Sequence, residues 1–140
     1  MRSRLLAALL LAVPPAAAVL APAPAAAQEG GAKVYKQAVP SVVWIHSARP
    51  KGLATGSGSL IDRDRRLVLT NYHVVEDNPK ATVFFPQFRD GQPVPEKQYY
   101  SDRAARLGVR GTVVAVDKGA DLAVIRIESV PDDAKGIPLA

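Results

Sequence analysis

The sequence contains no cysteine among its 140 residues. This absence excludes disulfide bonds, thiolate zinc sites and a cysteine nucleophile, so the stability of the fold must come from packing of the chain itself. Histidine is also scarce, with only His46 and His73 present. A zinc site built from both would need a third ligand at a suitable spacing, and the sequence offers none. We therefore expect neither a metal nor another cofactor.

The chain also lacks an apolar run long enough to span a bilayer. A basic start at residues 1–4 precedes the apolar residues 5–13, and two prolines then interrupt the run. The three alanines at 25–27 fit the small residues that precede a signal-peptide cleavage site. We interpret residues 1–27 as a signal peptide, and we expect an exported protein, periplasmic or extracellular, without a stable membrane anchor.

A large excess of one charge is absent as well. The net charge of +5 includes Arg2 and Arg4 of the predicted signal peptide, which leaves +3 for residues 28–140. The remaining basic residues are mixed with acidic ones, as at residues 62–66. A nucleic-acid partner needs a concentrated basic surface, so we expect none.

The remaining sequence indicates an all-β fold. Residues 28–40 form an N-terminal segment with a short helix expected at 32–38, which Pro40 ends. Residues 41–140 then contain short segments rich in β-branched residues. Six strands are predicted, at 41–47, 56–61, 66–70, 81–85, 111–116 and 122–127. Six short antiparallel strands with almost no helix between them favour a closed barrel, which leaves no exposed sheet edge. Residues 90–110 are longer than a hairpin loop and are expected to be functional or mobile.

Two titratable side chains stand at the ends of predicted strands. His73 follows the third strand within T-N-Y-H-V-V, and Asp121 opens the last strand within D-L-A-V. Earlier in the chain, Gly56 and Gly58 lie inside a strand in the phrase G-S-G, where glycine usually indicates a bend or a close backbone approach. Each phrase alone is weak evidence of a function, but all three occur here, in the order G-S-G, T-N-Y-H-V-V and D-L-A-V along the chain.

In that order the phrases resemble the first half of trypsin-like serine peptidases, specifically the bacterial high-temperature-requirement type. The resemblance covers nearly all of residues 28–140 and implies the first barrel of a double barrel. It gives His73 the role of general base and Asp121 the role of orienting it. The family's serine lies in a G-x-S-G-G turn on the second barrel. The sequence has no such turn, and Ser129, the only serine after Asp121, has no glycine beside it.

We therefore predict the N-terminal part of a secreted serine endopeptidase that is inactive by itself, because its nucleophile lies beyond this chain. Its partner would be a polypeptide substrate, unfolded or misfolded, bound through the second barrel. The alternative is a non-catalytic secreted β-barrel module that binds a protein or peptide through residues 90–110. A reading frame that continues past residue 140 into a second barrel would favour the enzyme.

Two other side chains compete for roles in this hypothesis. Asp117 could orient the histidine in place of Asp121, but the D-L-A-V phrase favours Asp121. Asp117 is instead predicted to begin a tight turn and to bind nearby backbone amides. His46 lies in the middle of a strand without a motif, so we expect it to be structural or on the surface.

Overall fold

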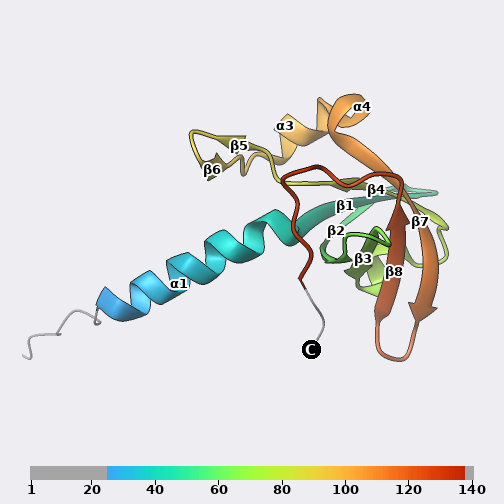
Figure 1. The fold of residues 1–140 in the computed structure, drawn as a ribbon. Coiled ribbons are helices and arrows are strands. Elements are labelled where there is room, and N and C mark those ends of the chain that lie inside the picture. The colour runs from blue at the N-terminus through green and yellow to red at the C-terminus, as the bar shows by residue number, and fades with distance from the viewer. Residues whose placement is uncertain (1–24, 138–140) are drawn as a thin grey trace, which may run out of the picture.

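The computed structural model describes residues 25–137, so residues 1–24 of the predicted signal peptide lie outside the described part. Helix α1 (Ala25–Ala38) leads into the short 3₁₀ helix η1 (Val39–Ser41). The helix is longer than the predicted 32–38 and projects away from the rest of the molecule (Figure 1). Alanine is the strongest helix former, which accounts for the earlier start. No helix within residues 25–137 is long and apolar enough to cross a membrane.

The body of the molecule is a closed antiparallel barrel with the strand order β1-β2-β3-β8-β7-β4. Its strands are β1 (Val42–Arg49), β2 (Gly52–Asp62), β3 (Leu67–Thr70), β4 (Lys80–Phe84), β7 (Gly108–Asp117) and β8 (Leu122–Ile127). The predicted six-stranded barrel is confirmed. Strands β2 and β7 start earlier than expected, because backbone pairing continues past the apolar segments, to Arg49↔Gly52 and Phe84↔Gly108.

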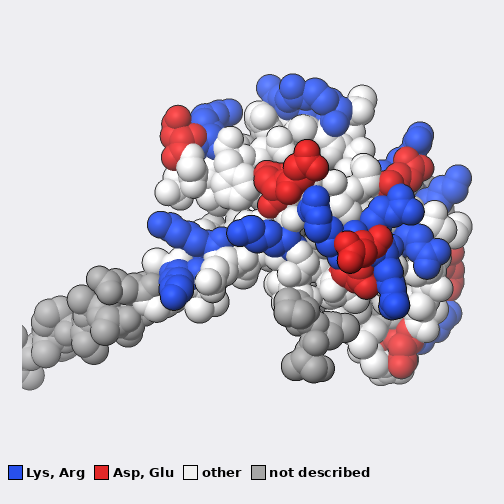
Figure 2. Space-filling model, in the orientation of Figure 1, with Lys and Arg blue, Asp and Glu red and all other residues white. Residues whose placement is uncertain are grey.

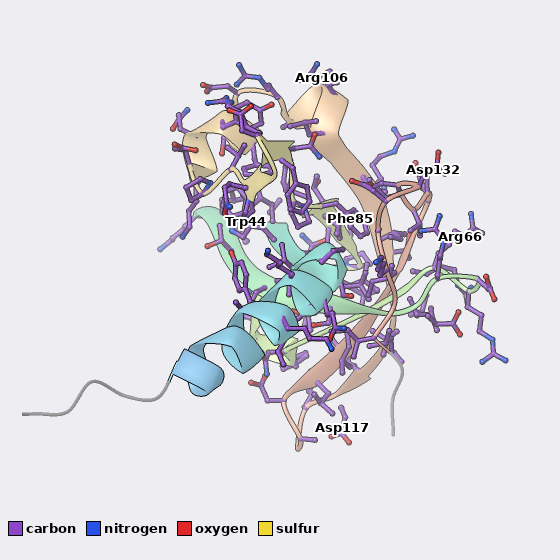
Figure 3. The ribbon with its side chains drawn as sticks, turned by 60° about the vertical axis from the view of Figure 1, so that its left-hand side comes forward. Trp44, Arg66, Phe85, Arg106, Asp117 and Asp132 are labelled. Atoms are coloured by element: carbon purple, nitrogen blue, oxygen red, sulfur yellow. The ribbon has the colours of Figure 1, made fainter. Side chains whose placement is uncertain are left out.

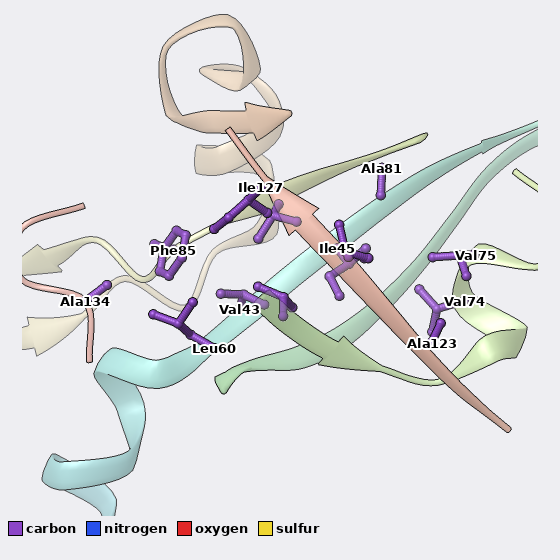
Figure 4. Packing of buried hydrophobic residues seen from close by; sticks show 13 residues of the cluster. Val43, Ile45, Leu60, Val74, Val75, Ala81, Phe85, Ala123, Ile127 and Ala134 are labelled. Carbon is purple, nitrogen blue, oxygen red and sulfur yellow. The ribbon is translucent and has the colours of Figure 1, made fainter. Parts of the chain in front are cut away.

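The barrel interior is filled by the inward-facing side chains of its strands. In β8, Ala123, Ile125 and Ile127 are buried while Arg126 is exposed, which is the alternation expected of a sheet with one wet face. The core also includes Val74 and Val75, which come from a short helix rather than from a strand. Figure 4 shows both valines beside Ala123. Burial of a valine side chain stabilises by about 1.5–3 kcal/mol, so these two side chains hold the helix on the barrel.

The segment between β4 and β7 is not the irregular loop that the sequence indicated. It contains a small hairpin, β5 (Phe88–Arg89) with β6 (Gln92–Pro93), followed by helices α3 (Lys97–Ser101) and α4 (Ala104–Leu107). Each element is five residues or shorter, and such pieces leave no periodic pattern in a sequence. The expectation of almost no helix between strands is therefore wrong in this segment.

A second apolar cluster packs this segment against the barrel. Tyr100 and Val94 are buried with Phe84 of β4, and the half-buried Trp44 of β1 lies against them. The Tyr100 hydroxyl donates a hydrogen bond to the Val94 carbonyl at 2.9 Å and accepts one from the Gln87 amide at 3.0 Å. The segment is therefore an ordered layer on one end of the barrel. On the visible face of the molecule, basic and acidic side chains are mixed (Figure 2).

Candidate active site

Strand pairing brings the two candidate residues to one end of the barrel. Strands β3 and β8 are hydrogen-bonded neighbours, with Thr70 opposite Ala123. The chain leaves β3 through Asn71 into helix α2 (Tyr72–Val75), whereas Asp121 stands immediately before β8. Because the strands are antiparallel, the end of β3 and the start of β8 lie at the same rim. The hydroxyl of Thr70 also donates to the Ser57 carbonyl at 2.8 Å, which ties this rim to β2.

His73 and Asp121 are joined by two hydrogen bonds. Nδ1 of His73 lies 2.7 Å from Oδ2 of Asp121, and the backbone N–H of His73 donates to Oδ1 at 2.9 Å. A carboxylate can only accept, so Nδ1 carries the proton and Nε2 is the acceptor in the neutral ring. The aspartate thus fixes both the tautomer and the direction of the imidazole. The side chains are 68% and 44% exposed, respectively.

The backbone of Asp121 is held as firmly as its side chain. Its carbonyl accepts from the Tyr72 amide and from the Asn71 side chain, both at 3.1 Å. Its φ of 53° lies in the left-handed region, where aspartate and asparagine are found more often than other non-glycine residues. These contacts offset the conformational cost and turn the carboxylate toward His73.

The pKa of the Asp121 carboxyl is lowered from its ordinary 3.8, first by the hydrogen bond from the His73 backbone and then by the one from its imidazole. A carboxyl whose folded-state pKa is depressed stabilises the fold above its unfolded pKa, and this stabilisation is lost as the pH falls through the folded value. The contact should therefore persist somewhat below pH 3.8.

We expect His73→Ala to raise the pKa of Asp121 only part of the way back toward 3.8, because the backbone donor, the larger cause, survives the substitution. A ¹³C NMR titration of the Asp121 carboxyl in both proteins measures this difference. An unchanged pKa in the alanine variant, or a full return to the ordinary value, would contradict the geometry described above.

The competing residues occupy other places. Asp117 sits at the tip of the β7–β8 hairpin (Figure 3), where its Oδ1 accepts from the Ala120 amide at 2.9 Å, as a turn residue does. His46 packs against the rings of Trp44 and Phe84, with centroids 4.0 and 4.8 Å away, and burial lowers its pKa. Ser129 is exposed past the opposite end of β8, roughly 20 Å of strand away from Asp121. The structure therefore pairs His73 with Asp121 alone among these residues.

A polar cluster beside the site has no counterpart in the sequence reasoning. Asp77 accepts hydrogen bonds from the Tyr72 hydroxyl and from Nζ of Lys118, each at 3.1 Å. The cluster links the end of α2 to the turn that precedes Asp121. Lys118 and Asp77 are exposed, so the ion pair between them contributes little free energy. Lys118 lies 41 residues from Asp77 in the sequence, and no spacing rule could have joined these two.

The described residues, 25–137, contain no group of three or more histidine, aspartate or glutamate side chains placed to hold a metal ion. Within the same residues, no serine hydroxyl is hydrogen-bonded to His73. What the site offers is an oriented imidazole that can accept a proton at Nε2 and be stabilised, once charged, by a carboxylate. A closed six-stranded barrel with such a pair at its rim is the arrangement of trypsin-like serine peptidases.

The comparison with protein families agrees with this geometry. The family described as "Trypsin-like peptidase domain" matches residues 56–140, and the chain belongs to that family. The resemblance to trypsin-like peptidases that was inferred from the three phrases is thereby confirmed. No curated protein matches the chain.

Solved structures with the same fold include those of two bacterial proteases. A serine endoprotease from Yersinia pestis superposes with a TM-score of 0.54 at 23% identity, covering 78% of this chain and 32% of that one, which shows the fold alone. The active form of the Rv3671c protease from M. tuberculosis gives 0.50 at 25% identity, covering 93% and 46%. The inactive form of a serine-to-alanine mutant of Rv3671c gives 0.53 at 26% identity, covering 87% and 46%. The chain thus spans less than half the length of each.

Proposed function

We propose that this chain provides the first barrel of an exported serine-type endopeptidase of the high-temperature-requirement type. In this proposal residues 1–27 act as a signal peptide to the periplasm or beyond, residues 28–40 lead in, and residues 41–140 are the barrel. The observation that carries the proposal is the 2.7 Å contact between Nδ1 of His73 and Oδ2 of Asp121 at the barrel rim. Family membership supports the reaction class.

In the proposed reaction, a serine hydroxyl on a second barrel attacks the carbonyl carbon of a peptide bond, and Nε2 of His73 takes the hydroxyl proton. Asp121 stabilises the resulting imidazolium without taking the proton itself. His73 then gives the proton to the leaving amine as the C–N bond breaks. Water hydrolyses the acyl-enzyme by the same proton relay.

The exposure of the pair supports the need for a second barrel. Electrostatic stabilisation of a transition state works best where water is excluded, yet the imidazole of His73 is 68% exposed. In the proposal the second barrel covers this rim and supplies the serine, the oxyanion donors and the substrate pocket. The substrate would be an unfolded or misfolded polypeptide.

We expect residues 28–140 alone to show no turnover of denatured casein above buffer, because no serine hydroxyl within the described residues 25–137 is hydrogen-bonded to His73, and the proposed oxyanion donors lie on the second barrel. Sequencing the gene past codon 140 should reveal a second barrel with a G-x-S-G-G turn, and the protein that includes it should cleave casein. Robust turnover by the isolated chain that His73→Ala abolishes would overturn the assignment of the nucleophile to a second barrel. A gene that ends at codon 140 would instead favour the non-catalytic binding module.

A further inference from the structure

Arg49, the last residue of β1, reaches from the β1–β2 hairpin to the helix that carries His73. Its Nη2 donates to the carbonyl of His73 at 2.8 Å and to that of Val74 at 3.2 Å. Its Nη1 forms an ion pair with Glu76. The side chain is only 19% exposed, which is unusual for an arginine. The guanidinium is therefore committed to the end of α2.

The two carbonyls that Arg49 binds accept no hydrogen bond from a backbone amide among the described residues. The last carbonyls of any helix have no partner within it, and α2 has only four residues. Backbone amides of Glu76 and Asn78 donate to the carbonyls of Tyr72 and Val75. The intervening carbonyls, of His73 and Val74, accept from Arg49 instead. A positive charge at this position also complements the negative end of the helix.

Glu76 adds a second link at the point where the chain leaves the helix. Its φ of 45° and ψ of −128° are strained for a residue with a side chain. The ion pair with Arg49 connects this strained residue to the β1–β2 hairpin. Because this backbone conformation of Glu76 ends the helix directly after Val75, the length and direction of α2 depend on how Glu76 is held.

The peptide groups on both sides of His73 are thus fixed by side chains from other elements. Its N–H donates to Asp121, and its C=O accepts from Arg49. When both peptide planes are held, the Cα–Cβ bond of the residue has one direction. That direction carries the imidazole to Oδ2 of Asp121.

We propose that Arg49 is a positioning residue for His73, holding the His73 and Val74 carbonyls so that the imidazole meets Asp121 in the tautomer that proton transfer requires. The inference rests on the proposed function of His73 as a general base. Its test measures the geometry of the imidazole and requires no proteolytic activity. Retained activity in His73→Ala would therefore contradict the proposed function of His73 but would not decide the positioning role of Arg49.

The test compares Arg49→Met with Arg63→Met in the ¹⁵N-histidine-labelled chain. Arg63 is a matched control, because it also donates to two backbone carbonyls, of Pro131 at 2.8 Å and Ala134 at 2.6 Å, but not to α2. Imidazole ¹⁵N shifts, read through the carbon-bound ring protons, give the tautomer ratio of His73. Hydrogen exchange gives the protection of its backbone amide.

We expect Arg49→Met to lower the ratio of the Nδ1–H to the Nε2–H tautomer about tenfold and to speed amide exchange of His73 to a similar degree, as the loss of hydrogen bonds from a charged donor implies. Arg63→Met should leave both readings at wild-type values. Arg49→Lys, which retains the charge and one directed hydrogen bond, should fall between. It also serves as the test if the methionine variant does not fold. Wild-type readings in the folded Arg49 variants would overturn the proposal.

Discussion

We expect the replacement of His73 with alanine to lower kcat by about 10⁴- to 10⁶-fold in the proposed protein that joins this barrel to a serine-bearing one. Alanine cannot accept the serine proton, so the nucleophile stays a neutral hydroxyl and the leaving amine receives no proton. KM should change little, because the imidazole acts on the reacting atoms rather than on the rest of the substrate. Steady-state kinetics on a peptide substrate measure both constants.

The partner substitution, Asp121→Asn, should lower kcat about 10⁴-fold. An asparagine amide can donate to Nδ1, and this favours the Nε2–H tautomer, which cannot take a proton from serine. Asp117→Asn is the matched control, since Asp117 lies in the same turn but binds only the Ala120 amide among the described residues. Equal losses in the two asparagine variants, or substantial activity in His73→Ala, would remove the basis for the assigned roles.

The substitution Gly56→Ala should disturb the site through the contact of β2 with Val74 of α2. An added Cβ there would lie 2.3 and 2.8 Å from the two Cγ atoms of Val74, the buried valine that follows His73. Either the strand or α2 must move, at a cost of about 1–3 kcal/mol in the free energy of unfolding. A shift of the imidazole by about 1 Å would cost a further 10²-fold in kcat in the joined protein. Denaturant unfolding and kinetics measure the two effects.

The control for Gly56→Ala is Gly136→Ala, because a Cβ at Gly136 would meet nothing closer than 3.6 Å. A compensating change gives a sharper test. In the double variant with Val74→Ala the two Cγ contacts are removed and only the Cβ of residue 74 stays close, at 3.2 Å, so the two substitutions together should destabilise less than the sum of the two alone. Simple additivity, or a Gly56→Ala variant as stable as wild type, would mean that the close approach of β2 and α2 does not constrain the site.

The strands could be predicted most directly where one face is buried and the other is exposed to solvent. In β8 the alternation of Ala123, Ile125 and Ile127 with Arg126 is visible in the sequence and is the same in the structure. The ends of β2 and β7 could not be predicted in this way. They are set by backbone pairing at Gly52 and Gly108, which does not require apolar side chains.

The site could be predicted only as far as its motifs extend. The positions of His73 and Asp121 at strand ends followed from local pattern, and their catalytic roles stay a prediction. The positive φ of Asp121 and the reach of Arg49 to α2 depend on how distant segments approach each other in space. Such contacts leave no trace at short spacing, so the sequence predicted the reacting groups but not the groups that hold them.

The segment between β4 and β7 leaves the barrel after Phe84 and returns at Gly108, and these two residues pair with each other. Additions or deletions within it can therefore close on the same hydrogen-bonded pair without shifting the strand register. Strand β7 then runs roughly 30 Å to the turn before Asp121. One end of the barrel can thus accept changes in the length of this segment, whereas the hydrogen bonds between His73 and Asp121 fix the spacing of β3 and β8 at the other end.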